Sequence, residues 1–213
     1  MSLPQSDPEI VYPQSDGKPM ADNTLQAAWI VALYTNLQWL FRQQTALVAA
    51  DLFWYPVEGN PKIVTAPDVM VALGRPEGYR SSYKQWEESD QPPQVVFEVL
   101  SPSNTPLEMV SKTLFYQNYG VDEFILIDAE VESFRVFLRQ EQRLVEPDFP
   151  LARWQSPRLG ISLEIVEGKL KAFLPDGSPF KTLQTESERA EQAEAELERL
   201  KEELARLKNE ENS

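Results

Sequence analysis

The sequence predicts an α/β domain (of the α+β kind) with a mixed sheet, followed by a separate C-terminal helix. Short apolar runs of strand length alternate with two longer segments in which apolar residues recur every three or four positions. Segments of alternating apolar and polar residues follow this core and favour an antiparallel extension of the sheet. The last stretch of the chain is highly charged and repeats leucine and alanine in a heptad pattern, which is typical of a coiled-coil helix.

The core elements are expected in the order helix, strand, strand, strand, helix, strand. The first helix is expected over residues 22–42, where apolar residues recur at helical spacing. The second is expected over residues 104–119, with Pro106 in its first turn and Gly120 directly after its end. The core strands are expected in four segments: 46–55, 63–73, 94–100 and 123–128. The antiparallel extension is expected in three later segments: 133–139, 161–166 and 169–174.

Three parts of the chain differ in composition and define the expected domain organisation. Residues 1–21 contain several prolines and are expected to form an extended arm. Residues 22–180 contain the core, and residues 181–213 form a helix with apolar residues at the a and d positions of a heptad repeat. A helix needs a partner to bury such a stripe, so we expect a coiled coil that makes a homodimer or a higher homo-oligomer. A solvated, partly frayed single helix is the alternative.

The amino-acid composition limits the chemistry that this protein can perform. The 213 residues include no Cys and no His. This excludes disulfides, zinc sites built from Cys or His, thiol nucleophiles and His-dependent catalysis. A metal ion would need oxygen ligands, which favours Mg²⁺, Mn²⁺ or Ca²⁺. Proton transfer would fall to Asp, Glu, Lys or Tyr.

The formal net charge of -14 lowers the expectation of non-specific DNA binding, because such binding depends on Lys and Arg near the phosphates. Part of this charge lies in the Glu-rich segment 186–213, outside the core segments. No apolar stretch approaches the roughly 18 residues needed to span a bilayer. The N-terminus also lacks a signal-peptide pattern. We therefore expect a soluble, cytoplasmic protein with no membrane partner.

Two acidic residues lie at strand positions of the expected core. Glu98 lies inside the apolar run 95–100, where an ionised carboxylate is costly unless another group pairs with it. Asp68 opens a second apolar run directly after Pro67. On neighbouring strands, these two carboxylates favour a site for a divalent cation. The structural alternatives are a turn-forming role for Asp68 and an ion pair for Glu98.

Two further residues are candidates for the same site. Lys112 lies in the expected second helix, on a mainly apolar face that must pack on the sheet. Its amine could reach a metal-bound water, or its side chain could instead run along the apolar surface towards solvent. Asp51 is another acid within an apolar segment, and it could be a third ligand or support one.

The expected loop between the two acidic strands has an unusual composition. Its segment 74–86 interleaves three aromatic residues with the basic residues Arg75, Arg80 and Lys84. Such a mixture suits phosphate contacts and base stacking in nucleic-acid binding, although a solvated surface loop can have the same composition. The position between the acidic strands favours a loop that flanks a substrate.

Five segments of the chain resemble one protein family. They are residues 55–60 (YPVEGN), 66–71 (APDVMV), 82–87 (SYKQWE), 96–104 (VFEVLSPSN) and 119–124 (YGVDEF). They resemble the Uma-type family of putative restriction endonucleases, a large group of bacterial proteins catalogued as a domain of unknown function. The family is similar to the PD-(D/E)XK nuclease superfamily. The resemblance covers residues 10–175 and is most specific over residues 51–128.

The resemblance implies a restriction-endonuclease-like core and hydrolysis of DNA phosphodiester bonds with Mg²⁺ or Mn²⁺. Asp68 and Glu98 match the two motif acids, and the backbone carbonyl of Val99 would complete the cation site. The superfamily lysine is expected two residues after the second acid. Leu100 occupies that position, so Lys112 on the next helix is the candidate for this role.

Two other functions agree with the same sequence. A catalytically degenerate nuclease fold that acts as an oligomeric interaction or regulatory module fits the acidic charge, the missing in-strand lysine and the C-terminal helix. A glycosidase with two carboxylates is a third possibility, but it would leave Lys112 without a role. Metal binding that depends on Glu98 would separate the nuclease from the glycosidase. Metal-dependent cleavage, tested across types of DNA, would separate it from the degenerate module.

Overall fold

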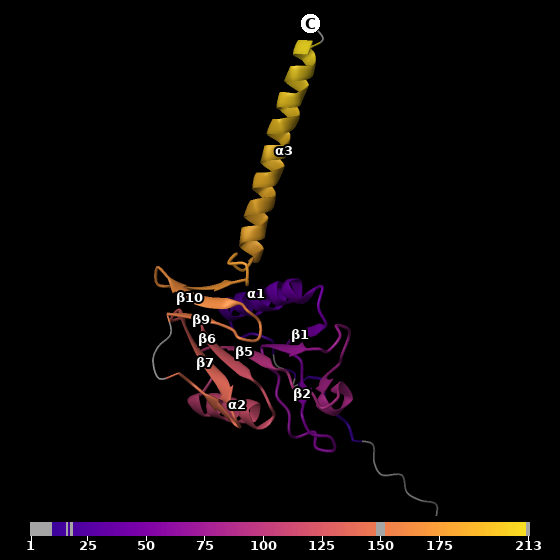
Figure 1. The fold of residues 1–213 in the computed structure, drawn as a ribbon, viewed down its shortest axis with the longest axis vertical. Helices are drawn as coiled ribbons and strands as arrows, with labels where there is room; N and C mark the ends of the chain where they lie inside the picture. Colours follow the sequence, from indigo (N-terminus) through magenta and orange to yellow (C-terminus); the bar gives the residue numbers. More distant parts are fainter. Residues whose placement is uncertain (1–9, 16, 18, 148–151, 212–213) are drawn as a thin grey trace, which may run out of the picture. The chain divides into compact units, whose positions relative to one another are not determined.

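The chain forms two compact units, residues 1–180 and residues 181–213. The first unit is an α/β domain with a six-stranded mixed sheet, and the second contains a single helix (Figure 1). The computed structural model describes the following residues: 10–15, 17, 19–147 and 152–211.

The six strands of the main sheet follow the order β1-β3-β5-β6-β7-β8. Strands β5 and β6 are parallel, whereas every other neighbouring pair in this sheet is antiparallel. The mixed sheet and the order of the core elements are therefore confirmed. The strands are β1 (Ala46–Ala50), β3 (Val69–Leu73), β5 (Val95–Val99), β6 (Glu123–Asp128), β7 (Ser133–Gln140) and β8 (Arg143–Val145).

Helix α1 (Thr24–Phe41) packs on one face of this sheet (Figure 1). Its N-cap is Asn23, whose side-chain Oδ1 accepts a hydrogen bond from the Gln26 N–H at 2.8 Å. Its apolar side chains face β1, β3 and β5, so that Leu33 and Phe97 belong to the same buried cluster. The predicted first helix is confirmed.

A separate three-stranded sheet covers the same face as α1. It has the order β11-β10-β9 and contributes Trp154, Leu163 and Ala172 to the buried cluster around α1. The predicted antiparallel extension of the main sheet is confirmed for residues 133–139, which lie in β7. The prediction was wrong for residues 161–166 and 169–174, which form this separate sheet. Strands β8 and β9 were also missed, since three residues are too few for a clear alternation. The strands are β9 (Arg153–Gln155), β10 (Ser162–Val166) and β11 (Lys169–Phe173).

Helix α2 (Pro106–Asn118) packs on the opposite face of the main sheet (Figure 1). Thr105 is its N-cap, and the Thr105 Oγ1 accepts a hydrogen bond from the Glu108 N–H at 3.2 Å. The only fully buried residue that α2 contributes, within the described part of the chain, is Tyr116. Tyr116 therefore anchors α2 to the sheet.

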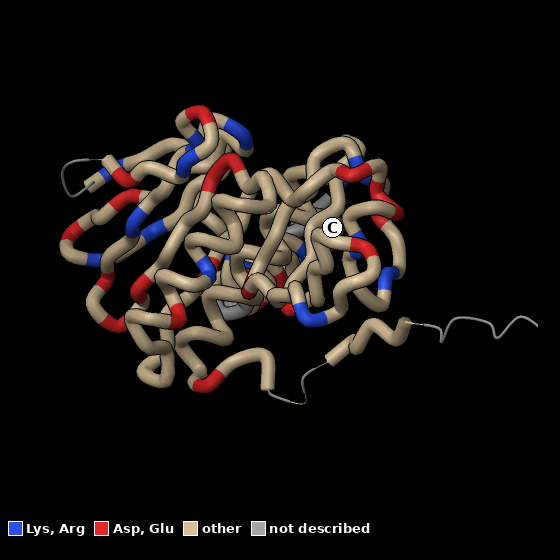
Figure 2. The backbone as a smooth tube through the Cα atoms, turned by 90° about the horizontal axis from the view of Figure 1, so that it is seen from below, with Lys and Arg blue, Asp and Glu red and all other residues tan. Residues whose placement is uncertain are grey.

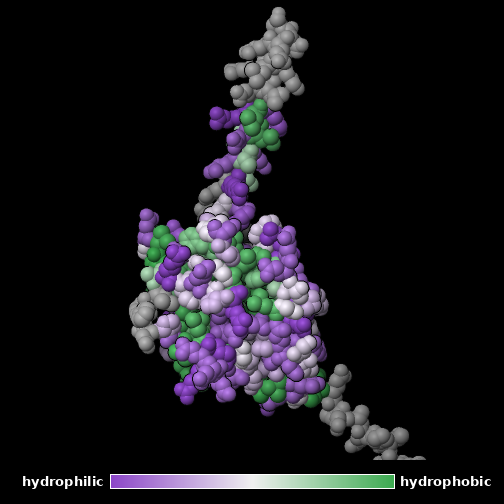
Figure 3. Space-filling view, viewed as in Figure 1, coloured by the Kyte–Doolittle hydropathy of each residue, from purple (hydrophilic) through white to green (hydrophobic). Residues whose placement is uncertain are grey.

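The outer face of α2 is unusually apolar. Leu107, Val110 and Leu114 lie at helical spacing and are 76%, 55% and 50% exposed. Such hydrophobic residues occur as separate patches on a mostly hydrophilic surface, as the face drawn in Figure 3 illustrates. The sheet-facing and outer faces of α2 thus both contain apolar residues, and polarity alone would not have shown which face packs inward.

The expected strand over residues 46–55 is interrupted. It divides into β1 and the two-residue strand β2 (Trp54–Tyr55), which pairs with β4 (Tyr83–Lys84). Between them Asp51 adopts a positive φ of 49°, a conformation that Asp tolerates better than most residues. The expected loop over residues 74–93 also contains structure, because β4 leads directly into the 3₁₀ helix η1 (Gln85–Glu88).

The described part of the N-terminal arm packs on this small β2–β4 sheet. The Tyr12 ring lies 5.0 Å from the Tyr55 ring and 5.2 Å from the Trp86 ring, between centroids. Tyr12 Oη accepts a hydrogen bond from the Gly59 N–H at 2.6 Å. The Tyr55 hydroxyl in turn donates to the Pro13 carbonyl at 2.5 Å. Aromatic packing and two hydrogen bonds therefore fix the arm on this small sheet.

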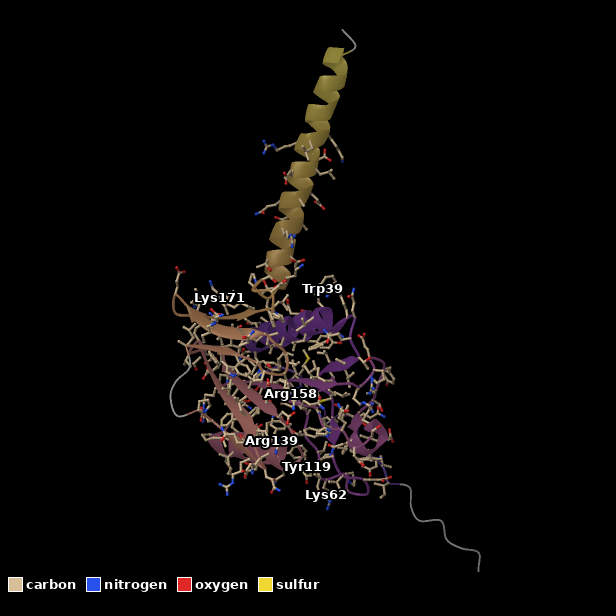
Figure 4. All side chains as sticks on the ribbon, viewed as in Figure 1. Trp39, Lys62, Tyr119, Arg139, Arg158 and Lys171 are labelled. Carbon is tan, nitrogen blue, oxygen red and sulfur yellow. The ribbon has the colours of Figure 1, made fainter. Side chains whose placement is uncertain are left out.

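An ion-pair network joins the main sheet to the segment after β9. Arg158 Nη2 lies 2.6 Å from Asp122 Oδ2, and Arg139 Nε lies 3.7 Å from Asp122 Oδ1. Arg139 also donates to the Tyr116 and Gln117 carbonyls at the C-terminal end of α2 and to the Val121 carbonyl that follows it. Figure 4 labels both arginines in neighbouring positions. This network fixes the C-terminal end of α2 and so limits how the helix can shift along β5.

The second unit is the helix α3 (Leu183–Glu211). The predicted continuous helix over the heptad segment is confirmed, and Leu197 and Leu200 on it are 52% and 54% exposed. Pairing of this helix with another copy stays a prediction. In the described ranges, no helix combines the length and the apolar character needed to cross a membrane.

Candidate active site

The three candidate acids lie at or directly beside the ends of three neighbouring strands: Asp51 follows β1, Asp68 precedes β3 and Glu98 lies in β5. Extending the registers of β1 with β3 and of β3 with β5 by one residue aligns Asp51 with Asp68 and Asp68 with Glu98. A hydrogen bond from the Asp51 N–H to the Asp68 carbonyl at 3.3 Å agrees with this alignment. Residues directly opposite each other on antiparallel strands project from the same face. Asp68 and Glu98 therefore both project towards α2.

Glu98 is the most deeply buried of these acids, with 3% of its surface exposed. Lys112 Nζ lies 2.8 Å from Glu98 Oε2 and forms an ion pair with it. The Tyr116 hydroxyl donates a hydrogen bond to Glu98 Oε1. Both carboxylate oxygens are thus satisfied, and hydrogen bonds to an ionised acceptor are about twice as strong as neutral ones. This pairing explains how a strand buried on both faces can contain an ionised Glu.

Helix α2 positions both donors. Lys112 and Tyr116 are four residues apart, so that they share the helix face directed at β5. The Tyr116 ring is fully buried, stacks parallel to the Trp54 ring at 6.3 Å and lies 5.0 Å from the Phe124 ring. The Lys112 side chain retains 21% exposure. The tyrosine therefore lies on the inner side of Glu98 and the lysine on the solvent side.

Electrostatics keep both groups protonated. Burial alone would lower the pKa of the Lys112 amine, but the charge and hydrogen bond of Glu98 outweigh it, so the pKa is raised above its usual value. Burial, followed by the Glu98 charge, raises the pKa of the Tyr116 hydroxyl well above its usual value. At neutral pH the site thus contains one ammonium and one neutral phenol, both acting as donors.

Asp68 lies next to this pair and is partly buried. Its Oδ2 accepts a hydrogen bond from the Val99 N–H at 2.6 Å. Burial, and then the Glu98 charge, raise the pKa of the Asp68 carboxyl to about 8, while the Val99 N–H and Lys112 act in the opposite direction. A single ammonium is therefore not enough to ionise both acids, and in the metal-free protein Asp68 keeps its proton up to a pH of about 8.

The second oxygen of Asp68 faces solvent. Among the described residues, no donor hydrogen-bonds Asp68 Oδ1, and no buried side-chain oxygen lacks a partner. Oδ1 must therefore retain contact with water. A carboxylate oxygen with solvent access, beside a second carboxylate, is a suitable ligand for a hard cation.

The backbone carbonyl of Val99 is held by α1. The Gln26 Nε2 donates a hydrogen bond to the Val99 carbonyl at 2.9 Å, and Gln26 Oε1 accepts one from the Asp22 N–H at 2.8 Å. Because a carbonyl oxygen has two lone pairs, one remains for a further partner. The N-terminal end of α1 thus fixes the position of the third candidate ligand.

The donor atoms fit a Mg²⁺ or Mn²⁺ ion, since Asp68, Glu98 and the Val99 carbonyl supply oxygen only. Asp51 is exposed and follows β1 in a left-handed conformation. Within the described ranges, no group of three or more acidic side chains is arranged to hold one ion. The structure therefore brings Asp68, Glu98 and Lys112 together, but it does not add Asp51 as a third carboxylate, and water would complete the coordination.

The three basic residues predicted to bind DNA already have partners. Arg80 Nε lies 2.5 Å from Glu88 Oε1. Lys84 Nζ lies 3.0 Å from Glu87 Oε1, and Arg75 Nη1 donates to Ser89 Oγ at 3.1 Å. Figure 2 shows basic and acidic residues interspersed along the backbone. Phosphate contacts at this segment would require the ion pairs with Glu87 and Glu88 to open.

An apolar groove lies elsewhere on the domain. It has a volume of about 480 Å³ and runs between α1 and β1, with Arg80 and Tyr79 at its rim. Consecutive β1 residues, from Leu47 to Ala50, line it, although their side chains alternate between faces. The groove therefore follows the edge of the sheet, and its lining includes none of the three residues Asp68, Glu98 and Lys112.

Two residues of the site were not predicted from the sequence. Tyr116 lies four positions after Lys112, which places it on the right helix face but does not show that its hydroxyl reaches Glu98. Gln26 is a buried polar residue on a mainly apolar face of α1. A buried polar side chain requires a hydrogen-bond partner, and this requirement was the available signal.

The core and these residues define a restriction-endonuclease-like class of proteins, with paired acids on adjacent strands and a lysine nearby. The chain belongs to the Uma2 family, described as "Putative restriction endonuclease", whose model matches residues 3–170. The predicted family is confirmed.

A solved structure has the same fold. It is described as a putative nuclease belonging to DUF820 from Anabaena variabilis ATCC 29413. The two chains are 18% identical and superpose with a TM-score of 0.50, over 68% of this chain and 80% of that chain. No protein of curated function matches the sequence. The family and the fold together indicate a nuclease.

Proposed function

We propose that this protein is a Mg²⁺- or Mn²⁺-dependent endonuclease that hydrolyses phosphodiester bonds in DNA. The observation that supports this most directly is the opposition of Asp68 and Glu98 on β3 and β5, with the Lys112 ammonium beside them. One ammonium does not keep both acids ionised, because the pKa of Asp68 is raised to about 8, so a divalent cation would replace the Asp68 proton and supply the missing positive charge. The membership of the nuclease-like family agrees with this chemistry.

Each residue of the site has a role in this proposal. Asp68, Glu98 and the Val99 carbonyl would hold the cation, which when bound polarises a phosphate and makes a water molecule more acidic. The Lys112 ammonium would stabilise negative charge that develops on the phosphate in the transition state. Tyr116 holds Glu98 in a fixed orientation, because its hydroxyl donates to Oε1. Arg75, Arg80 and Lys84 would contact the DNA backbone, and for Arg80 and Lys84 this requires their ion pairs with Glu88 and Glu87 to open.

A second candidate function is a catalytically degenerate nuclease fold that acts as an oligomeric interaction or regulatory module. The observation that favours it is the pairing of the basic residues. Lys112 is bound to Glu98, and Arg80 and Lys84 are bound to acids of η1. A protein of this kind could keep the fold and form oligomers through α3 without cleaving DNA.

Cleavage assays on several forms of DNA would separate the two functions. Wild-type protein with Mg²⁺ or Mn²⁺ should cut supercoiled, linear or single-stranded DNA, and the Asp68→Ala variant should not cut any of them. The exposed acid Glu58 provides a matched control, since Glu58→Ala should cut as the wild type does. Intact DNA of every form with both cations, from a folded wild-type protein, would instead favour the module.

We further propose that α3 pairs two or more copies of the chain. The apolar stripe of α3 includes Leu197 and Leu200, which remain about half exposed in the single chain. Sedimentation should therefore give an oligomeric mass for the full chain and a monomeric mass for a chain that ends at Thr182. Equal monomeric masses for both proteins would contradict this pairing.

A further inference from the structure

The two oxygens of Glu98 have different surroundings. Oε1 accepts a hydrogen bond from Tyr116, which has 0% exposure and is enclosed by aromatic rings. Oε2 is bound to Lys112, whose side chain is 21% exposed. A cation that enters from solvent would therefore meet Oε2 first. The Lys112 ammonium already occupies the position next to Oε2 that such a cation would take.

We propose that Lys112 occupies the cation position in the metal-free protein and that a divalent cation displaces its ammonium from Glu98 Oε2. Tyr116 keeps Oε1 throughout, so that Glu98 remains in place during the exchange. The inference rests on the proposed function, because it assigns the cation site to Asp68 and Glu98. It goes beyond that function by giving Lys112 two successive partners.

Electrostatic repulsion disfavours simultaneous binding of the ammonium and a divalent cation at Oε2. An ammonium and a divalent cation on the same oxygen would lie only a few ångströms apart in a partly buried site, where repulsion between like charges is strong. Glu98 cannot avoid this conflict by rotating, because the hydrogen bond from Tyr116 fixes its other oxygen. The Lys112 stem is flexible and partly exposed, so the lysine is the group that can move.

The exchange has a consequence for the reaction. A displaced Lys112 ammonium remains on the solvent side of Glu98, which is the side from which a DNA phosphate would approach. Cation binding would therefore release a positive charge next to the substrate at the same time as it fills the site. The position of the lysine on α2, instead of on β5, permits this movement, because Tyr116 rather than Lys112 anchors the helix.

The first test uses the wild-type protein without DNA. The rate at which an amine-reactive acylating reagent modifies Lys112 would be measured by mass spectrometry, with and without Mn²⁺. We expect the rate to rise severalfold with Mn²⁺, because the amine loses its carboxylate partner. Lys169, which pairs with Glu132 at 2.8 Å on the surface, is the matched control and should not change. An unchanged or slower rate at Lys112 would overturn the proposal.

The second test compares Mn²⁺ affinities by titration calorimetry, again without DNA. The Lys112→Met variant keeps the length of the stem but removes the competing ammonium, so it should bind Mn²⁺ about tenfold more tightly than the wild type. Lys169→Met should bind as the wild type does. Equal or weaker binding by Lys112→Met would contradict the exchange. If this variant fails to fold, the labelling of the wild-type protein still decides.

The two proposals can fail separately. If the protein cleaves DNA but Lys112 stays paired with Glu98 when Mn²⁺ is added, the exchange is overturned and the nuclease function still stands. Exchange without any cleavage would support the inference about Lys112 and favour the degenerate module over the nuclease.

Discussion

Replacing Glu98 by Ala is expected to lower the free energy of unfolding by about 2–4 kcal/mol and to abolish any cleavage of DNA. The substitution removes the acceptor of the Lys112 ammonium and of the buried Tyr116 hydroxyl. Leaving a buried donor without a partner costs more than a hydrogen bond contributes, because the group has lost its water as well. Urea denaturation of the metal-free protein would measure the loss of stability.

Two further variants make this expectation specific. Glu130→Ala changes an exposed acid and should alter the stability by no more than about 0.5 kcal/mol. Glu98→Gln keeps the shape of the side chain and an acceptor oxygen, so it should be more stable than Glu98→Ala. An Ala variant as stable as the wild type would show that Lys112 and Tyr116 find other partners, and the account of this site would then be wrong.

The Asp68→Asn variant is expected to change how stability depends on pH. The pKa of Asp68 in the folded protein is raised from 3.8 to about 8, so the folded state binds this proton more tightly than the unfolded state. The stability that the proton contributes is fully present below the unfolded pKa and is lost as the pH rises towards 8. Each unit of difference between the folded and unfolded pKa values corresponds to about 1.4 kcal/mol in the free energy of unfolding.

Metal-free wild-type protein should therefore become less stable between pH 5 and pH 8, over roughly the range set by the two pKa values of Asp68. Asn cannot ionise, so Asp68→Asn should lose less stability over the same interval and exceed the wild type at pH 8. Thermal unfolding in a chelator at several pH values would measure both curves. Parallel curves would contradict the raised pKa and the close approach of Glu98.

The sequence predicted the central elements well where local signals were strong. The segment 123–128 forms β6 with the expected bounds, and α2 begins beside Pro106 as its cap predicts. Short elements were harder to predict. β2 was merged with β1 into one expected strand and β4 was placed in a loop, since each has two residues and depends on pairing between distant segments. Such pairs are stabilised by tertiary contacts, which no local pattern in the sequence records.

The candidate site was predictable in part. An acid inside a buried strand requires a partner, and this requirement pointed to Glu98. Lys112 was predicted to reach the same site, but its ion pair with Glu98 was not assigned. The register that places Asp68 opposite Glu98 was not predictable, because it depends on how two strands far apart in the sequence align. The same dependence hid the contact of Tyr116 with Glu98. The ion pairs of Arg80 and Lys84 were missed for a local reason, because their acidic partners lie in η1, a segment that was expected to be a loop.

The most direct test of the central claim is the Mg²⁺-dependent nicking of supercoiled plasmid by wild-type protein and by Glu98→Gln, measured side by side. The account predicts that the wild type converts the plasmid to open-circular and linear forms, and that a chelator stops the reaction. It predicts that Glu98→Gln cuts at least about a hundredfold more slowly while remaining folded. Equal cutting by both proteins, or cutting that continues in the chelator, would contradict the claim that Glu98 holds a catalytic cation.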